Sequence, residues 1–316
     1  MRTLESEVGA PEPSAEAEAE RKSWGQQISL TIFLVVPFLA LIAAVPLTWG
    51  WGLSWRDVAI ATVMYYVSGL GVTVGFHRLL THRSFHAPRL VRAALAIAGS
   101  MALENSATQW VADHRRHHRF SDREGDPHSP WRYGSSFQAL TRGFFYSHVG
   151  WLYDWETTDE TKYAPDLVAD RDIAWISKTF VLWAALSVSL PPLVGGLLGW
   201  SWKAALTAFV WGSLVRICLL HHVTFAINSV CHITGRRPFR TKDRSQNVWW
   251  LAILSFGESW HNFHHAEPTS ARHGVRRFEL DTSAILIRVM ERLRWVSDVR
   301  WPDRATISRR LMAPTG

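Results

Sequence analysis

Two cysteines are all that this 316-residue chain contains, and only 19% of its residues are charged. Cys218 and Cys231 have no metal-ligand spacing and are too few for a disulfide framework, so we predict reduced thiols in or near membrane helices. The N-terminus lacks a signal-peptide pattern, because its first 20 residues are acidic and rich in Ala and Pro. We expect residues 1–25 to form a disordered acidic tail.

Four stretches of the chain are long and apolar: the first two carry no charge, the third carries Lys178 near its start, and the fourth is interrupted by Arg216. A helix that crosses a bilayer needs roughly 20 apolar residues, and each of these stretches is long enough. Very short turns join the first to the second and the third to the fourth, which predicts two transmembrane hairpins. We therefore expect an all-α integral membrane protein with spans at about residues 28–49, 58–76, 175–199 and 202–222.

The distribution of Lys and Arg predicts the orientation of the spans. The hairpin turns hold only Arg56 and Lys203, whereas the polar regions are rich in arginine. The positive-inside rule then places both termini and both polar regions in the cytoplasm. We expect the chain to lie in the inner membrane of the cell. The net charge is +7, and the basic residues flank apolar segments. This placement favours a lipid surface over nucleic acid as their partner. We expect a membrane domain at 26–280 and a cytosolic helical tail at 281–316.

Histidine is abundant, with 15 residues, and eight of them form three short boxes. Positions i, i+3 and i+4 share one face of a helix, so two boxes each present three imidazoles together. The first box spaces its two histidines five apart, about 140° around an ideal helix, which requires a helix end or a distortion. The boxes are His77 with His82, His114 with His117 and His118, and His261 with His264 and His265.

A ninth histidine, His232, lies on the expected extension of the fourth span. From Trp202 to His232 a helix would run about 45 Å, longer than a ~30 Å hydrocarbon core. One face of the extension carries His221, Thr224, Phe225, Asn228 and His232, which suits the wall of a metal and substrate site. The alternative is a plain amphipathic exit helix.

Imidazole binds iron, zinc and copper, and one zinc takes about four protein ligands. Nine candidates suit two metal ions rather than one. A carboxylate di-metal site would need a second Glu-x-x-His motif beside Glu258, and the sequence contains none. We therefore expect a histidine-rich site in a cytosolic helical cap, with Glu258 in a supporting role. The six other histidines are predicted to be surface or hydrogen-bonded residues.

From about residue 58 to residue 277, the chain resembles the membrane fatty acid desaturases, and more closely the stearoyl-CoA delta-9 type and its bacterial relatives. Several strings carry the resemblance together, namely 75–85, 113–118, 126–128, 142–151, 228–232 and 257–265. The resemblance implies two irons, O2 as co-substrate and a cis double bond in a long saturated acyl chain. It implies as ligands His77, His82, His114, His117, His118, His232, His261, His264 and His265, with Asn228 acting through water.

The resemblance also suggests residues of the substrate tunnel. Trp110 matches a residue that shapes its bend, Thr224 and Phe225 are the expected partners on the fourth helix, and Asn105 matches a residue near the substrate head. Acyl-CoA is the default carrier. However, basic residues that meet the CoA phosphates in animal members are replaced by Ala112 and the acidic segment 154–156. A membrane lipid or carrier-protein ester is the alternative.

The resemblance implies an oxidoreductase whose electrons come from a separate ferredoxin-like donor or flavin reductase. A related hydroxylase or ketolase remains open, since the same hydrogen abstraction begins both reactions. A membrane metal-binding or transport protein without enzymatic activity is a third alternative. A transporter would place polar ligands at mid-membrane, whereas these boxes lie at the cytoplasmic ends of the spans.

Overall fold

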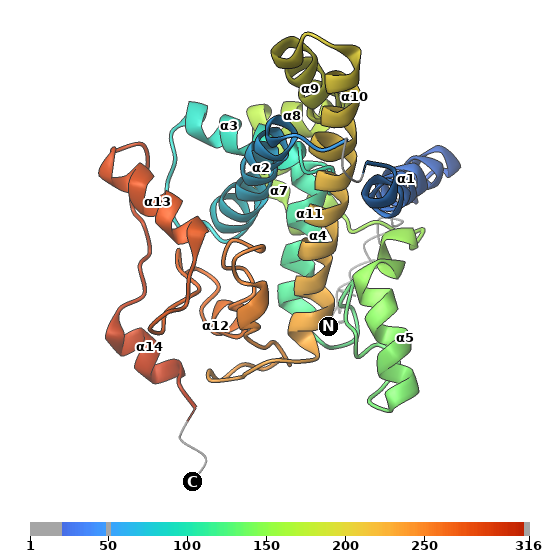
Figure 1. Cartoon of the computed structure of the whole chain (residues 1–316). Coiled ribbons are helices and arrows are strands. Elements are labelled where there is room, and N and C mark those ends of the chain that lie inside the picture. Colours follow the sequence, from blue (N-terminus) through green and yellow to red (C-terminus); the bar gives the residue numbers. More distant parts are fainter. Residues whose placement is uncertain (1–20, 49–51, 313–316) are drawn as a thin grey trace, which may run out of the picture.

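The computed structural model describes residues 21–48 and 52–312 and contains helices without any strand in those ranges. Residues 1–20 of the expected acidic tail lie outside the described part, and helix α1 already begins at Trp24. The order of elements follows the chain in Figure 1. The elements are α1 (Trp24–Thr48), α2 (Trp55–Leu70), η1 (Gly71–Thr81), α3 (Arg89–Ser100), α4 (Ala107–Phe120), α5 (Phe137–His148), η2 (Gly150–Tyr153), α6 (Glu160–Tyr163), α7 (Pro165–Ala169), α8 (Arg171–Lys178), α9 (Phe180–Gly199), α10 (Trp202–Ala208), η3 (Phe209–Val215), α11 (Arg216–Ser229), η4 (Val230–His232), η5 (Trp249–Leu251), α12 (His261–Ala266), α13 (Thr282–Arg292) and α14 (Arg304–Arg310).

Four helices of the described residues are long and apolar enough to cross a membrane, as the sequence predicts. They are Trp24–Ala44, Trp55–Thr81, Phe180–Gly199 and Trp202–His232. The third begins later than the predicted residue 175, because α8 ends at Lys178 and α9 starts at Phe180. The fourth continues ten residues beyond the predicted residue 222, which makes the expected extension a real part of the helix.

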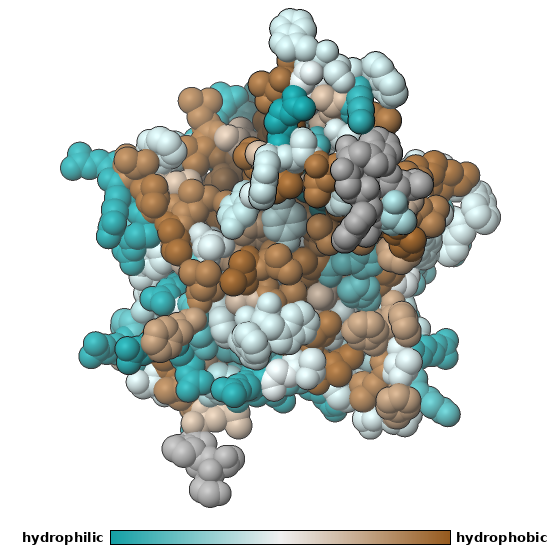
Figure 2. All heavy atoms as spheres, in the orientation of Figure 1, coloured by the Kyte–Doolittle hydropathy of each residue, from teal (hydrophilic) through white to brown (hydrophobic). Residues whose placement is uncertain are grey.

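The spans pack around the fourth helix. Helices α9 and α10 lie along each other, while α1 and α2 both pack against η3 within the fourth span. In Figure 1, α1 and α2 lie on opposite sides of that helix. Figure 2 shows apolar side chains over the middle and upper part of the same face, and hydrophilic ones along its lower edge.

Two segments of the spans are π-helices, η1 and η3, in which each N–H bonds the carbonyl five residues back. Every residue of η1 is buried, mainly because α3 packs along it. Two glycines permit this close approach. A Cβ at Gly71 would lie 2.2 Å from the backbone nitrogen of Gly99, and one at Gly75 would lie 2.8 Å from the carbonyl oxygen of Leu95.

The C-terminal helices close the cap below the second span. The Thr73 and Ser283 hydroxyls are 2.8 Å apart and join η1 to α13. Near α14, the Arg240 amide donates to the Arg310 carbonyl at 2.8 Å. Both cysteines, Cys218 and Cys231, are buried and free, as the sequence predicts.

Candidate metal centre

Nine histidines gather in two adjacent groups near the ends of the second and fourth apolar helices. Within each group, one ring nitrogen of every residue lies within 4.8 Å of the others. The rings of His118 and His265 stack across the boundary with centroids 4.5 Å apart. The five-histidine group is His77, His82, His114, His118 and His264, and the four-histidine group is His117, His232, His261 and His265. These are the same nine residues that the spacing and the resemblance select from the sequence.

The distortion required by the first box is the π-helix η1. Closing each turn over five residues brings positions five apart to the same face, so His77 and His82 point together. The His82 amide donates to the His77 carbonyl at 3.1 Å, and their ring centroids are 4.9 Å apart. The other boxes lie on ordinary α-helical turns of α4 and α12.

Carboxylates fix the orientation of four of these rings. In each pair a carboxylate oxygen lies within hydrogen-bond distance of Nδ1, so the imidazole donates from Nδ1 and leaves Nε2 as a lone pair for a metal. The pairs are His77 with Glu258 at 2.6 Å, His117 with Asp126 at 3.0 Å, His232 with Asp122 at 2.9 Å and His265 with Asp243 at 2.8 Å.

The Nε2 atoms then face one another at close range. His261 Nε2 lies 3.0 Å from Nε2 of His232 and 3.0 Å from Nε2 of His265. Because both of those partners donate from Nδ1, His261 faces two lone pairs and carries at most one proton to share between them. Nitrogen ligands at about 2.1 Å from one metal, set at right angles, are about 3.0 Å apart. The donor set therefore fits a metal ion better than a hydrogen-bond network.

Two further ring nitrogens support this fit. Nε2 of His82, in the five-histidine group, and Nε2 of His117, in the four-histidine group, are buried and have no hydrogen-bond partner among the described residues. A buried polar atom without a partner is costly in a folded protein, and a metal ion would satisfy both nitrogens.

The electrostatic environment keeps several of the imidazoles neutral. Burial, reinforced by neighbouring imidazoles, lowers the pKa of His114, His118 and His264 well below the ordinary histidine value. A neutral imidazole is the form that binds a metal. Burial pushes the pKa of Asp126 upward, but the adjacent His117 outweighs it and holds that pKa below its usual range. Asp126 therefore stays ionised beside His117.

Glu258 is held from two sides, which agrees with the supporting role expected for it. The fully buried Arg78 places its NH2 group 3.0 Å from Glu258 and 3.0 Å from Asp281, and donates from NH1 to the Ala271 carbonyl at 2.8 Å. Burial opposes ionisation of Glu258, yet His77 and Arg78 lower its pKa well below the usual value. The charge that orients His77 is thus fixed by a guanidinium.

The predicted substrate residues fall into two places. The Trp110 indole stacks on His114 with centroids 5.1 Å apart and donates to Glu104 at 3.3 Å, and Glu104 also bonds the side chain of Thr224. Asn105, the next residue, is exposed with a positive φ of 110°. Phe225 instead packs among other rings, those of His148, His221 and His222. Asn228 lies half-buried one helical turn before His232.

Sequence reasoning missed several members of the centre. Asp122 and Asp243 were not recognised as partners of histidines, and Glu104 was not recognised between Trp110 and Thr224. His128 and His273 were predicted as ordinary histidines, but each lies in a buried triad with a carboxylate and one box histidine. The string 126–128, which carries an acid two residues before a histidine, was the available signal for Asp126 and His128.

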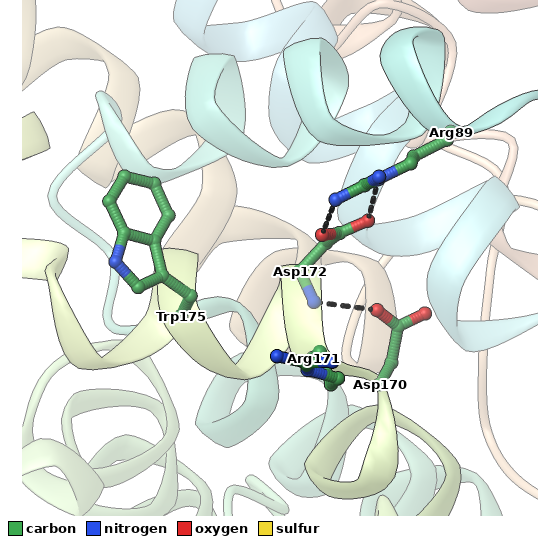
Figure 3. Close-up of a pocket in the computed structure, with 5 residues that line it drawn as sticks. All are labelled: Arg89, Asp170, Arg171, Asp172 and Trp175. Carbon is green, nitrogen blue, oxygen red and sulfur yellow. Dashed lines mark hydrogen bonds and ion pairs between the residues drawn. The ribbon is translucent and has the colours of Figure 1, made fainter.

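A cavity of about 600 Å³ lies elsewhere, at the surface between α3 and α8 (Figure 3). Its charged groups neutralise each other, since Arg89 donates twice to Asp172 at 2.7 Å. It contains none of the nine histidines. This cavity therefore offers no metal chemistry.

Several known proteins are similar to this chain in sequence. The pattern of fatty acid desaturases matches residues 53–282. A hex-5-enoyl-[acyl-carrier protein] acetylenase of Moorena producens is 36% identical over 89% of this chain and 88% of its own length. Delta-9 acyl-lipid desaturase 1 of Arabidopsis thaliana is 37% identical, over 89% and 84%. An icosanoyl-CoA 5-desaturase of Limnanthes douglasii is 34% identical, over 90% and 76%. The chain therefore belongs to the fatty acid desaturase family.

Proposed function

We propose that the protein is an O2-dependent di-iron desaturase that introduces a cis double bond, at the delta-9 position, into a long saturated acyl chain. The observation that carries this proposal is the pair of adjacent histidine groups, in which Nε2 of His261 lies 3.0 Å from Nε2 of His232 and 3.0 Å from Nε2 of His265. Family membership supports an oxidoreductase that acts on fatty acids.

Each histidine group would hold one iron, and Asn228 would hold one of the two through water. The irons, with O2, would supply the oxidant that removes hydrogen from an unactivated methylene, which has no acidic proton for a base to take. The chain's own residues orient and shield. Glu258, Asp122, Asp126 and Asp243 fix the imidazole rings, while Trp110 and Thr224, joined through Glu104, would form the wall against which the acyl chain bends.

We also propose the topology that the sequence predicts. Two transmembrane hairpins would carry the domain at 26–280, with the centre, the C-terminal helices and both termini in the cytoplasm. Four apolar helices support a membrane protein. The contact of α9 with α10 supports the second hairpin. His77 lies near the end of the second helix and His232 at the end of the fourth. Helix α12, which carries three further histidines, is far from the α9–α10 turn in Figure 1.

For the acyl carrier, two observations favour a membrane lipid over CoA. Ala112, which replaces an expected basic residue, is fully buried and offers no positive charge to a phosphate. Asp154 accepts a 2.6 Å hydrogen bond from Tyr146 and adds negative charge where CoA phosphates would need positive charge. Relatives named for lipid, carrier-protein and CoA substrates all occur. An acyl-lipid substrate is our first choice, and acyl-CoA is the alternative.

The test is expression in a host that lacks unsaturated fatty acids, with a ferredoxin and its reductase co-expressed, followed by mass spectrometry of the lipids. We expect a new cis monoene that disappears in His264→Ala. The matched control is His86→Ala, an exposed histidine outside both groups, which should leave the product unchanged.

Other outcomes separate the alternatives. Hydroxylated or keto chains would indicate a hydroxylase or ketolase on the same scaffold. Unchanged lipids, with a functioning donor present, would contradict an enzyme and leave a membrane metal-binding protein. Feeding labelled acyl-CoA or labelled phospholipid to isolated membranes would then decide the carrier.

A further inference from the structure

The loop that follows the fourth span is unusually cationic. Between residues 236 and 244 it carries five exposed basic side chains and a single carboxylate, Asp243. Basic segments of this density attract acidic partners and raise the rate of encounter with them. We call residues 236–244 the cationic loop, and its basic members are Arg236, Arg237, Arg240, Lys242 and Arg244.

Helix α14 extends this charge from a distant part of the chain. Phe239 of the cationic loop pairs with Leu311, next to the bond between Arg240 and Arg310. Arg309 and Arg310 are also exposed, and only Arg310 is paired with an acid there, Glu267 at 3.1 Å. The cationic loop and α14 together form what we call the cationic surface.

The cationic surface touches the four-histidine group directly. The Asp243 carboxylate lies 2.8 Å from Nδ1 of His265. Arg244 stacks over Trp131 at 3.7 Å, and the Trp131 indole donates to the His232 carbonyl at 2.9 Å. One side chain of the cationic loop, Asp243, therefore contacts a proposed ligand directly, and another, Arg244, reaches one through a single tryptophan.

The distance from the membrane favours a protein partner over lipid headgroups. The fourth helix has 31 residues, Trp202–His232. That is about 46 Å of helix, and a hydrocarbon core of ~30 Å with the headgroup layer of one leaflet takes up all but roughly 10 Å. The cationic loop begins beyond its end, at the lower edge of Figure 1, where Figure 2 shows hydrophilic side chains.

The proposed function requires a donor at such a surface. Reduction of O2 to two waters takes four electrons and four protons. Two of each leave with the two hydrogen atoms of the acyl chain, so two electrons must come from a donor protein, which is oxidised, and two protons from water. Electron-transfer complexes are commonly small and short-lived, and a charged patch is sufficient to assemble one.

We propose that the cationic surface is the docking site of an acidic one-electron carrier protein, and that electrons enter the centre at its four-histidine side. This inference rests on the proposed function, because desaturation is what requires electrons from a donor. The surface itself, and its closeness to His265 and His232, are independent of the reaction.

The test measures binding without turnover. The full-length protein in nanodiscs is titrated with an acidic plant-type [2Fe–2S] ferredoxin as the probe, at several salt concentrations. We expect Arg240→Glu/Lys242→Glu to weaken binding by about tenfold or more, and wild-type affinity to fall steeply with salt. Both side chains are exposed, so their replacement should leave the loop folded. The matched control, Arg292→Glu/Arg294→Glu, makes the same charge change at exposed sites on and after α13 and should stay within about twofold.

Three outcomes would overturn the proposal. The first is equal ferredoxin affinity for wild type and the loop variant. The second is an equal loss in the control, which would indicate a general charge effect. The third is unchanged ferredoxin affinity with reduced binding to phosphatidylglycerol vesicles, which would make the surface a lipid contact. Lipid analysis of the same strains separates this from the proposed function, since wild type forming no monoene contradicts desaturation whatever the titrations show.

Discussion

The two histidine groups have similar ligands but different supports. In the five-histidine group only His77 is oriented by a carboxylate, Glu258, and that charge is shared with the buried Arg78. In the four-histidine group, three of the four rings are paired with ionised aspartates. The protein thus places more negative charge around the second group. More charge favours an ion of higher charge by simple Coulomb attraction, so the two metal sites should differ although their imidazoles are alike.

The groups also differ in what holds them in place. The five-histidine group is fixed by the end of a span, η1, packed tightly against α3. The four-histidine group depends on loop carboxylates, Asp122 and Asp243, which lie near the surface. We infer that the first site is built by helix packing and the second by electrostatics.

The largest expected effect comes from removing one ligand of each group. His264→Ala and His261→Ala should each abolish the fatty acid product. Loss of a partner that supports a ligand lowers metal affinity or activity by up to ~100-fold, and loss of the ligand itself should cost more. Iron analysis should show about half of the wild-type metal in each variant, since the groups are separate. Complete loss of metal from either variant would contradict two separable sites.

Stability should depend on the guanidinium of the five-histidine group. Arg78→Met leaves Glu258 and Asp281 buried without their counter-charge, which costs about 3–5 kcal/mol when one partner of a buried pair is removed. Denaturant unfolding in detergent measures the change. Arg83→Met is the control, because Arg83 pairs with Asp166 at an exposed position. Equal losses of unfolding free energy in both variants would mean that the buried ion pairs of Arg78 stabilise the fold no more than the exposed pair of Arg83.

Iron affinity should respond to the aspartates of the four-histidine group. Asp126→Asn keeps the size of the side chain but weakens its bond to His117, and we expect a 10–100-fold loss of affinity for about one iron. Competition with a chelator measures it, with the exposed Asp298→Asn as control. Loss of metal from both groups together would contradict two sites that bind iron separately.

A smaller effect concerns pH. Burial raises the pKa of Glu104, beside Trp110, to about 7 from 4.5. Because this pKa is higher in the folded state than in the unfolded state, Glu104 contributes to the free energy of unfolding in full below pH 4.5. That contribution is lost as the pH rises toward 7. The melting temperature of wild type should therefore fall more between about pH 5 and about pH 8 than that of Glu104→Gln. Parallel pH profiles for the two proteins would show that Glu104 does not titrate there.

Local spacing is why the sequence was sufficient for most of the centre. Residues such as His114, His117 and His118 lie on one helical face whatever the tertiary structure, and long uncharged runs reveal the spans. Partners that meet only through folding were not predictable. Asp243 reaches His265 because the cationic loop turns back over α12, where the Phe239 amide donates to Asn262. Glu104 meets Thr224 because α11 packs beside the segment between α3 and α4, where His221 lies 2.8 Å from the Ala102 carbonyl. The π-helix lies between these cases, since the five-residue spacing required a distortion without specifying which.

The second span has two helical periodicities in one continuous rod. Its α2 half repeats every 3.6 residues and presents side chains such as Val63 and Val67 outward, whereas its η1 half repeats over a longer turn and presents His77 and His82 inward. Substitutions in the lipid-facing half therefore leave the phase of the metal-binding half unchanged. Such a rod could adapt to bilayers of different composition during evolution while keeping its catalytic geometry in register.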